Sequence, residues 1–137
     1  MILVVDDERP LADMLVEMLA LIGRRAMAVY SAEEAMEVLQ KQEPALIVSD
    51  VVMPGADGVE LAIEARRLWP KVKILFISGN AATQEIMDEA FVHGHTFELL
   101  AKPVPPKDLL LKIAGMLSGD EWNEQQQSRT AGAKLRK

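Results

Sequence analysis

The sequence contains no cysteine among its 137 residues, and aromatic side chains make up only 4% of it. A chain without cysteine forms no disulfide and offers no thiolate for chemistry, which fits a cytoplasmic protein. No apolar run approaches the roughly 20 residues of a transmembrane helix. The opening MILVVDDE has no basic region and soon reaches Asp6 and Asp7, so we expect no signal peptide. Secreted, membrane-spanning and disulfide-stapled classes are therefore disfavoured, and the core is expected to be aliphatic.

The charge balance is acidic, with 21 Asp and Glu against 15 Lys and Arg and a net charge of −6. This balance argues against a broad grip on the phosphate backbone of nucleic acid, because such binding is electrostatic in origin. Half of the residues are apolar and 26% are charged, which is ordinary for a globular domain of this length. We therefore expect a globular protein with neither direct nucleic-acid binding nor membrane binding.

Five apolar, strand-like runs alternate with helical patterns along the chain. The runs are Ile2 to Val5, Ala26 to Tyr30, Ala45 to Ser49, Val72 to Ile77 and Phe97 to Ala101. Helices are expected from Pro10 to Gly23, after a Ser31–Glu34 capping box, after Asp57, from Thr83 to about Val92, and from Pro106 onward. This strict alternation predicts a doubly wound α/β domain with a parallel sheet and right-handed crossovers.

The composition changes near Ser118. The residues that follow are polar, with few apolar anchors. We interpret residues 1–118 as the domain and residues 119–137 as a polar C-terminal tail or linker.

Polar side chains gather where the expected strands end. Asp6 and Asp7 close the first strand, Asp50 closes the third, Ser78 closes the fourth, and Lys102 follows the fifth. In an open parallel sheet, ligands bind beyond the carboxyl ends of the strands. If the first and third strands are neighbours, three carboxylates and one ammonium share a single pocket.

Such a pocket suits phosphoryl chemistry. Carboxylates held close together repel unless a cation neutralises them, and their hard oxygens favour Mg²⁺. A lysine and a serine hydroxyl can hold phosphate oxygens, and an aspartate can itself attack a phosphoryl group. The pattern therefore predicts transfer of a phosphoryl group onto a carboxylate.

Residues 1 to about 118 resemble the receiver domain of bacterial two-component response regulators, the CheY-like family. The matching segments, in order, are Ile2 to Glu8, Ile47 to Gly55, Asp57-Gly58, Phe76 to Gly79 and Lys102-Pro103. Each segment alone is weak, but all of them in order at the correct strand ends are specific. The resemblance implies a flavodoxin-like, five-stranded parallel sheet in the order 2-1-3-4-5, with helices on both faces.

The resemblance also implies roles for individual residues. Asp50 would accept the phosphoryl group from a phosphohistidine of a partner histidine kinase. Asp7 would bind Mg²⁺ directly and Asp6 through water, with Asp50 and the backbone carbonyl of Val52 as further ligands. Lys102 would pair with the aspartyl phosphate.

Ser78 would move to hydrogen-bond the phosphoryl group, and Lys102-Pro103 would form the family's cis-proline junction. Phosphorylation would change the face made by the fourth helix, the fifth strand and the fifth helix, which is also a possible homodimer surface. The protein would be a signalling switch in a phosphorelay, and would catalyse only its own phosphorylation and dephosphorylation.

One position departs from the family pattern. The family's switch aromatic usually lies three residues before the lysine, where this chain has Leu99, while Phe97 lies five residues before it. The usual aromatic readout is therefore in doubt.

Two alternative functions remain beside the switch. One is a receiver-like scaffold that acts without phosphorylation. The other is a Mg²⁺-dependent phosphohydrolase, which would need a second acid where this chain has Val52. The sequence names neither the kinase nor the output, and leaves open whether this is a stand-alone receiver or part of a larger regulator or hybrid kinase.

Overall fold

The computed structural model describes residues 1–129 except 54–55, 80–87, 89–90, 92–93 and 95–96. The chain divides into two compact units, Met1–Val104 and Pro105–Lys137. The first unit contains the sheet and every residue that the sequence places at the candidate site, so its architecture decides how the site is built.

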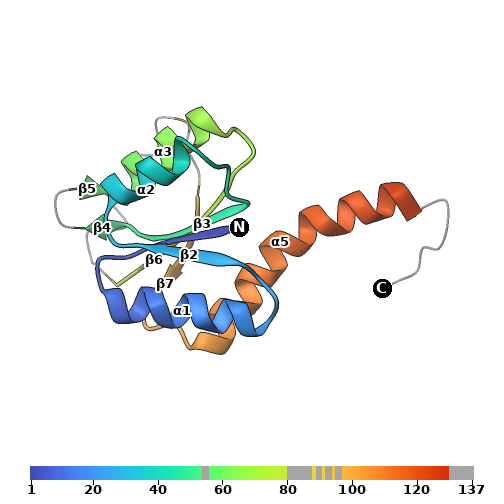
Figure 1. The fold of residues 1–137 in the computed structure, drawn as a ribbon, viewed down its shortest axis with the longest axis horizontal. Coiled ribbons are helices and arrows are strands. Elements are labelled where there is room, and N and C mark those ends of the chain that lie inside the picture. Colours follow the sequence, from blue (N-terminus) through green and yellow to red (C-terminus); the bar gives the residue numbers. More distant parts are fainter. Residues whose placement is uncertain (54–55, 80–87, 89–90, 92–93, 95–96, 130–137) are drawn as a thin grey trace. The chain divides into compact units, whose positions relative to one another are not determined.

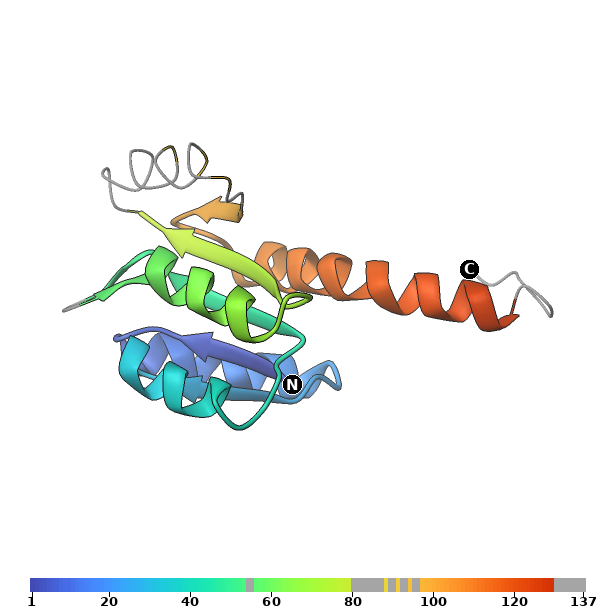
Figure 2. The same cartoon turned by 90° about the horizontal axis from the view of Figure 1, so that it is seen from above.

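A five-stranded parallel sheet forms the centre of the first unit. Its strands are β1 (Ile2–Val5), β2 (Ala26–Val29), β3 (Leu46–Asp50), β6 (Lys73–Ser78) and β7 (Glu98–Ala101). They lie in the order β2-β1-β3-β6-β7, all parallel, and the turned view shows β7 at one edge (Figure 2). Counting these strands along the chain gives 2-1-3-4-5, so the expected order is confirmed. A short antiparallel pair, β4 (Val52–Met53) with β5 (Ala56–Asp57), was not predicted.

In the described part of Met1–Val104, three helices lie against the two faces of this sheet. Helix α1 (Arg9–Leu21) lies on one face, and α2 (Ala32–Leu39) and α3 (Gly58–Leu68) lie together on the other (Figure 1). All four residues of β1 are buried, as expected for a central strand covered on both faces. The largest fully buried side chains are mostly aliphatic, with Phe76 as the one aromatic among them. The sheet ends are therefore held on a rigid, closely packed base.

The capping residues and the terminal glycine predicted for the first two helices lie largely where the sequence placed them. Ser31 Oγ accepts a hydrogen bond from the Glu34 backbone N–H at 3.1 Å, which caps α2. The Glu34 carboxylate reaches back to the Tyr30 N–H at 2.9 Å, one residue before the cap itself. Gly23 follows α1 with a φ of +82°, a backbone conformation that glycine adopts at little cost.

The second unit contains α5 (Pro106–Arg129), which begins at the expected proline. The helix continues through residue 118, so the composition change there does not mark the end of the helical backbone. The helix expected from Thr83 to about Val92 lies almost entirely outside the described residues. Among the residues that the structure describes, no helix combines the length and apolar character needed to span a membrane.

Candidate functional site

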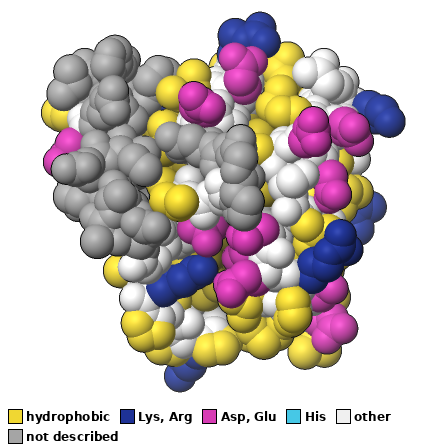
Figure 3. Space-filling view, turned by 90° about the vertical axis from the view of Figure 1, so that its left-hand side faces the viewer, with side chains coloured by type: hydrophobic (Ala, Val, Ile, Leu, Met, Phe, Trp, Pro, Cys, Tyr) yellow, Lys and Arg dark blue, Asp and Glu magenta, His cyan; other side chains and the backbone are white. Residues whose placement is uncertain are grey.

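The carboxyl ends of β1 and β3 bring three aspartates together. The two strands are neighbours in the sheet, with Val5 paired to Ser49, so Asp6 and Asp50 follow at the same edge. One oxygen from each of Asp6, Asp7 and Asp50 lies within 4.8 Å of the others. Figure 3 views the side on which β4 and β5 lie in Figure 1, and Asp and Glu side chains gather near the middle of this face. The juxtaposition expected from the sequence is therefore present.

Lys102 supplies the positive charge of this cluster. Its Nζ lies 3.3 Å from Asp50 Oδ2 and 4.0 Å from Glu8 Oε1. Its backbone N–H donates to the Ser78 carbonyl at 3.1 Å, which fixes the chain just beyond β7. The Lys102–Pro103 peptide bond is cis, as the resemblance implied.

The Asp50 side chain lies at the bottom of the cluster and is only 14% exposed. Its Oδ1 accepts a long hydrogen bond of 3.4 Å from the Val52 N–H, and its Oδ2 faces Lys102. Both carboxylate oxygens therefore have a donor near them.

Opposing influences act on the pKa of Asp6. Burial is the largest influence and raises the pKa of Asp6, and the nearby charges of Asp50 and Asp7 raise it further. The Glu8 N–H, which donates to Asp6 Oδ1 at 2.9 Å, and the Lys102 ammonium lower the pKa without offsetting the rise. The ionised form of Asp6 is thus held at a cost, which a bound cation would relieve.

Lys102 keeps its proton more firmly than an exposed lysine. Burial, the largest single influence, would lower its pKa, but the attraction of Asp50, the hydrogen bond to it, and the charges of Asp6 and Glu8 together outweigh burial and raise the pKa. The site therefore contains a permanent ammonium among carboxylates. Three clustered carboxylate oxygens form the hard donor set that Mg²⁺ prefers, so the residues present fit this ion.

Gly58 is a residue whose structural role sequence reasoning missed. Its N–H donates to the Val51 carbonyl at 2.6 Å, and it is buried at the start of α3. A Cβ on Gly58 would overlap the backbone carbonyl oxygen of Asp50. The absence of a side chain therefore lets α3 begin directly against the end of β3. The sequence shows only a glycine after a candidate capping aspartate, which does not reveal this contact.

Ser78 ends β6 and is buried, with 5% of its surface exposed. Because Asp50 pairs with Ile77 in the sheet, Ser78 lies at the same edge as Asp50. The structure thus places Ser78 where the sequence analysis expected it. Its hydrogen-bonding role toward a phosphoryl group stays a prediction, as does the role of the Val52 carbonyl as a metal ligand.

Leu99, which stands at the position of the family's switch aromatic, lies in β7, and Phe97 directly precedes this strand. Leu99 is half-buried, pairs with Phe76 in the sheet and packs against the core. Phe97 packs edge-on against Phe76 with ring centroids 5.2 Å apart, and the Arg66 guanidinium lies 4.5 Å from the Phe97 ring centroid. The Phe97 ring is therefore held between the Phe76 ring of the core and the Arg66 cation.

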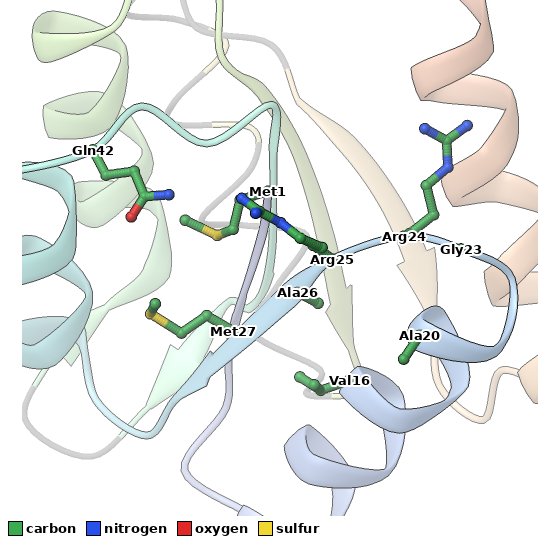
Figure 4. A pocket seen from close by; sticks show the side chains of 9 residues that line it. All are labelled: Met1, Val16, Ala20, Gly23, Arg24, Arg25, Ala26, Met27 and Gln42. Atoms are coloured by element: carbon green, nitrogen blue, oxygen red, sulfur yellow. The ribbon is translucent and has the colours of Figure 1, made fainter.

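A hollow of about 530 Å³ lies at the other end of β1 and β2 (Figure 4). Met1, Arg25 and Met27 line it together with the end of α1. None of its lining residues belongs to the carboxylate cluster, so this hollow is separate from the candidate site.

Comparisons with known proteins agree with this geometry. The family model described as the response regulator receiver domain matches residues 2–114. The chain is 36% identical over 124 residues to the response regulator protein FleR of Pseudomonas aeruginosa, covering 88% of this chain and 26% of FleR. It is 34% identical over 116 residues to the response regulator receiver protein CpdR of Brucella abortus, covering 85% of this chain and 95% of CpdR.

A solved structure shows the same fold. The CheY-like response regulator receiver domain protein of Methanospirillum hungatei superimposes with a TM-score of 0.79 at 28% identity, covering 89% of this chain and 96% of that one. The relatives differ in length, since the chain spans about a quarter of FleR and nearly all of CpdR.

Proposed function

The chain belongs to the response regulator receiver domain family, and we propose that it accepts a phosphoryl group on Asp50 as a two-component signalling switch. The observation that carries this proposal is the 3.3 Å contact between Lys102 Nζ and Asp50 Oδ2 beside two further aspartates. Receiver domains work with histidine kinases, so we propose a kinase phosphohistidine as the donor.

Each residue then has a distinct task in the transfer. An oxygen of the Asp50 carboxylate forms a new bond to phosphorus while the phosphorus–nitrogen bond of the donor breaks, and the imidazole nitrogen leaves with the electron pair and takes up a proton. The Lys102 ammonium faces the oxygens on which charge accumulates during this step. Ser78, at the end of the neighbouring strand, donates a hydrogen bond to the phosphoryl group of the product.

We further propose that Asp6, Asp7 and Asp50 hold Mg²⁺, with the Val52 carbonyl as an additional ligand. When bound, this ion neutralises charge on the transferring phosphoryl group. The support is the cluster of three carboxylates and the raised pKa of Asp6, which burial causes in the first place. The protein would be a phosphoprotein that acts as a signalling domain and turns over only its own phosphoryl group.

Neither alternative function gains support from the site. A phosphohydrolase of the aspartyl-phosphate type needs a second acid where the chain has the apolar Val52. A scaffold that acts without phosphorylation does not require a half-buried aspartate paired with a lysine, and removing such a pair from water costs free energy. A cytoplasmic location stays a prediction. So does a homodimer through the fourth helix, β7 and α5, because most of the fourth helix lies outside the described residues.

Intact-mass measurement after incubation with acetyl phosphate and Mg²⁺ tests the proposal. The wild type should gain the mass of one phosphoryl group, and a chelator should abolish the gain. Asp50→Asn is the matched variant, because it keeps the size of the side chain and removes the nucleophile. A gain that is equal in wild type and Asp50→Asn, or no gain in folded wild type with Mg²⁺ present, would contradict the proposal.

A further inference from the structure

A fourth carboxylate, that of Glu8, borders the site without belonging to the aspartate cluster. Glu8 Oε1 lies 4.0 Å from Lys102 Nζ. The exposed fraction of the side chain is 60% for Glu8, 31% for Lys102 and 14% for Asp50. Glu8 is therefore the most exposed of these three charged side chains.

The backbone position of Glu8 makes this orientation notable. Glu8 is the N-cap residue of α1, where a side chain commonly accepts a hydrogen bond from the first turn, yet its side chain makes no such bond. Its backbone makes the hydrogen bonds instead: the Glu8 N–H donates to Asp6, and the Glu8 carbonyl accepts from the N–H groups of Leu11 and Ala12. The carboxylate is thus left to face Lys102 rather than the helix.

The Glu8 carboxylate repels an incoming phosphodonor, because both are negatively charged. A donor's phosphoryl group is anionic, and when it lies at Lys102 and Asp50 it is close to the Glu8 carboxylate, whose Oε1 is 4.0 Å from Lys102 Nζ. The three aspartates and Glu8 outnumber the single ammonium, and a divalent ion would not reverse the sign of the site. Like charges at a partly exposed site repel each other modestly, and the repulsion between Glu8 and a donor grows with the negative charge of the donor.

We propose that Glu8 is a specificity-determining residue for phosphoryl transfer to Asp50, one that disfavours free donors carrying two negative charges. This inference rests on the function proposed above and adds to it a preference among phosphodonors. In the transfer from acetyl phosphate, Asp50 forms the new bond to phosphorus while the bond to the acetate oxygen breaks, and acetate leaves with the electron pair. Glu8 takes no part in these bonds and acts on how readily the donor enters.

The test compares two small donors of different charge at neutral pH with saturating Mg²⁺. Acetyl phosphate is a dianion under these conditions, whereas phosphoramidate carries less negative charge. Glu8→Gln should raise kcat/KM for acetyl phosphate about two- to fivefold, as expected for a surface charge, through a lower KM. The gain should be smaller for phosphoramidate and should shrink as salt is added.

Two further variants complete the design. Glu8→Asp keeps the charge and should preserve the wild-type ratio of kcat/KM for acetyl phosphate to kcat/KM for phosphoramidate. Glu17→Gln removes an equal charge from an exposed position further along α1 and should also leave that ratio unchanged.

The outcomes separate this inference from the function on which it rests. If wild type is phosphorylated at Asp50 but has the same ratio of kcat/KM for acetyl phosphate to kcat/KM for phosphoramidate as Glu8→Gln, the role of Glu8 is overturned. The proposed function would still stand. An equal shift in Glu17→Gln would also overturn the role of Glu8, because the effect would then come from net charge. Wild type that accepts a phosphoryl group from neither donor would overturn the proposed function, and the role of Glu8 with it.

Discussion

Replacing Gly58 with alanine tests whether the start of α3 is closely fitted to the phosphoacceptor strand. The added Cβ would overlap the Asp50 carbonyl oxygen and would lie 3.1 Å from both the Cα and the carbonyl oxygen of Val51. All of these are backbone atoms, so the clash is relieved only if the end of β3 or the start of α3 moves. Overpacking of this kind costs about 1–3 kcal/mol, and the better helix propensity of alanine returns up to about 1 kcal/mol.

The two contributions leave a net loss of up to about 3 kcal/mol in the free energy of unfolding. Because every overlapped atom belongs to the backbone, we expect Gly58→Ala to lose about 1–2 kcal/mol of it and the Tm to fall by about 3–10 °C. Gly115→Ala is the matched control, because Gly115 lies in α5 and a Cβ there would meet nothing within 4 Å. The control should raise stability by up to about 1 kcal/mol through helix propensity. Thermal denaturation followed by circular dichroism measures both variants, and equal or greater stability of Gly58→Ala would refute the reasoning.

Three further predictions follow from the charges and the apolar neighbour of Asp50. Mg²⁺ should raise the Tm of the wild type, by the equivalent of about 2.7 kcal/mol at a hundred times its Kd, and Asp7→Asn should weaken the effect; a Tm indifferent to Mg²⁺ and to chelator would count against the metal site. Because burial raises the pKa of Asp6, its ionised form destabilises the fold at neutral pH, and this penalty disappears below the ordinary aspartate pKa of about 4. Asp6→Asn should therefore be more stable than wild type in urea at neutral pH without divalent ions, and the gain should shrink as the pH falls; a difference independent of pH would argue against that origin. Val52 is apolar and 38% exposed, so it cannot hydrogen-bond an attacking water, and phosphorylated wild type should lose its phosphoryl group more slowly than Val52→Asn; equal or faster loss from wild type, followed by intact mass, would contradict this.

Most of the sheet could be predicted from the sequence because its strands are apolar runs of four to six residues that alternate with clear helical stripes. Strand order came from the resemblance rather than from periodicity. The β4–β5 pair was missed because two residues per strand are too few to show any alternation. Residue 118 lies within α5, and the polar residues that follow continue the helix because Glu and Gln are good helix formers. Composition alone therefore does not show where this helix ends, and the domain boundary near residue 118 stays a prediction.

The residues of the site that directly follow or end a strand could be predicted from the sequence. Asp6, Asp7 and Asp50 follow parallel strands, so they meet wherever β1 and β3 are neighbours. The contributions of Gly58 and Glu8 depend on a backbone contact and a side-chain direction that no residue pattern encodes. The roles of these two residues could therefore be recognised only in the three-dimensional structure.

Peptide mapping with tandem mass spectrometry locates the phosphoryl group and so tests whether Asp50 itself becomes phosphorylated. After treatment of wild type with acetyl phosphate and Mg²⁺, the added mass should lie on Asp50 alone. A phosphoryl group on Asp6, Asp7 or Ser78, with Asp50 unmodified, would contradict the account.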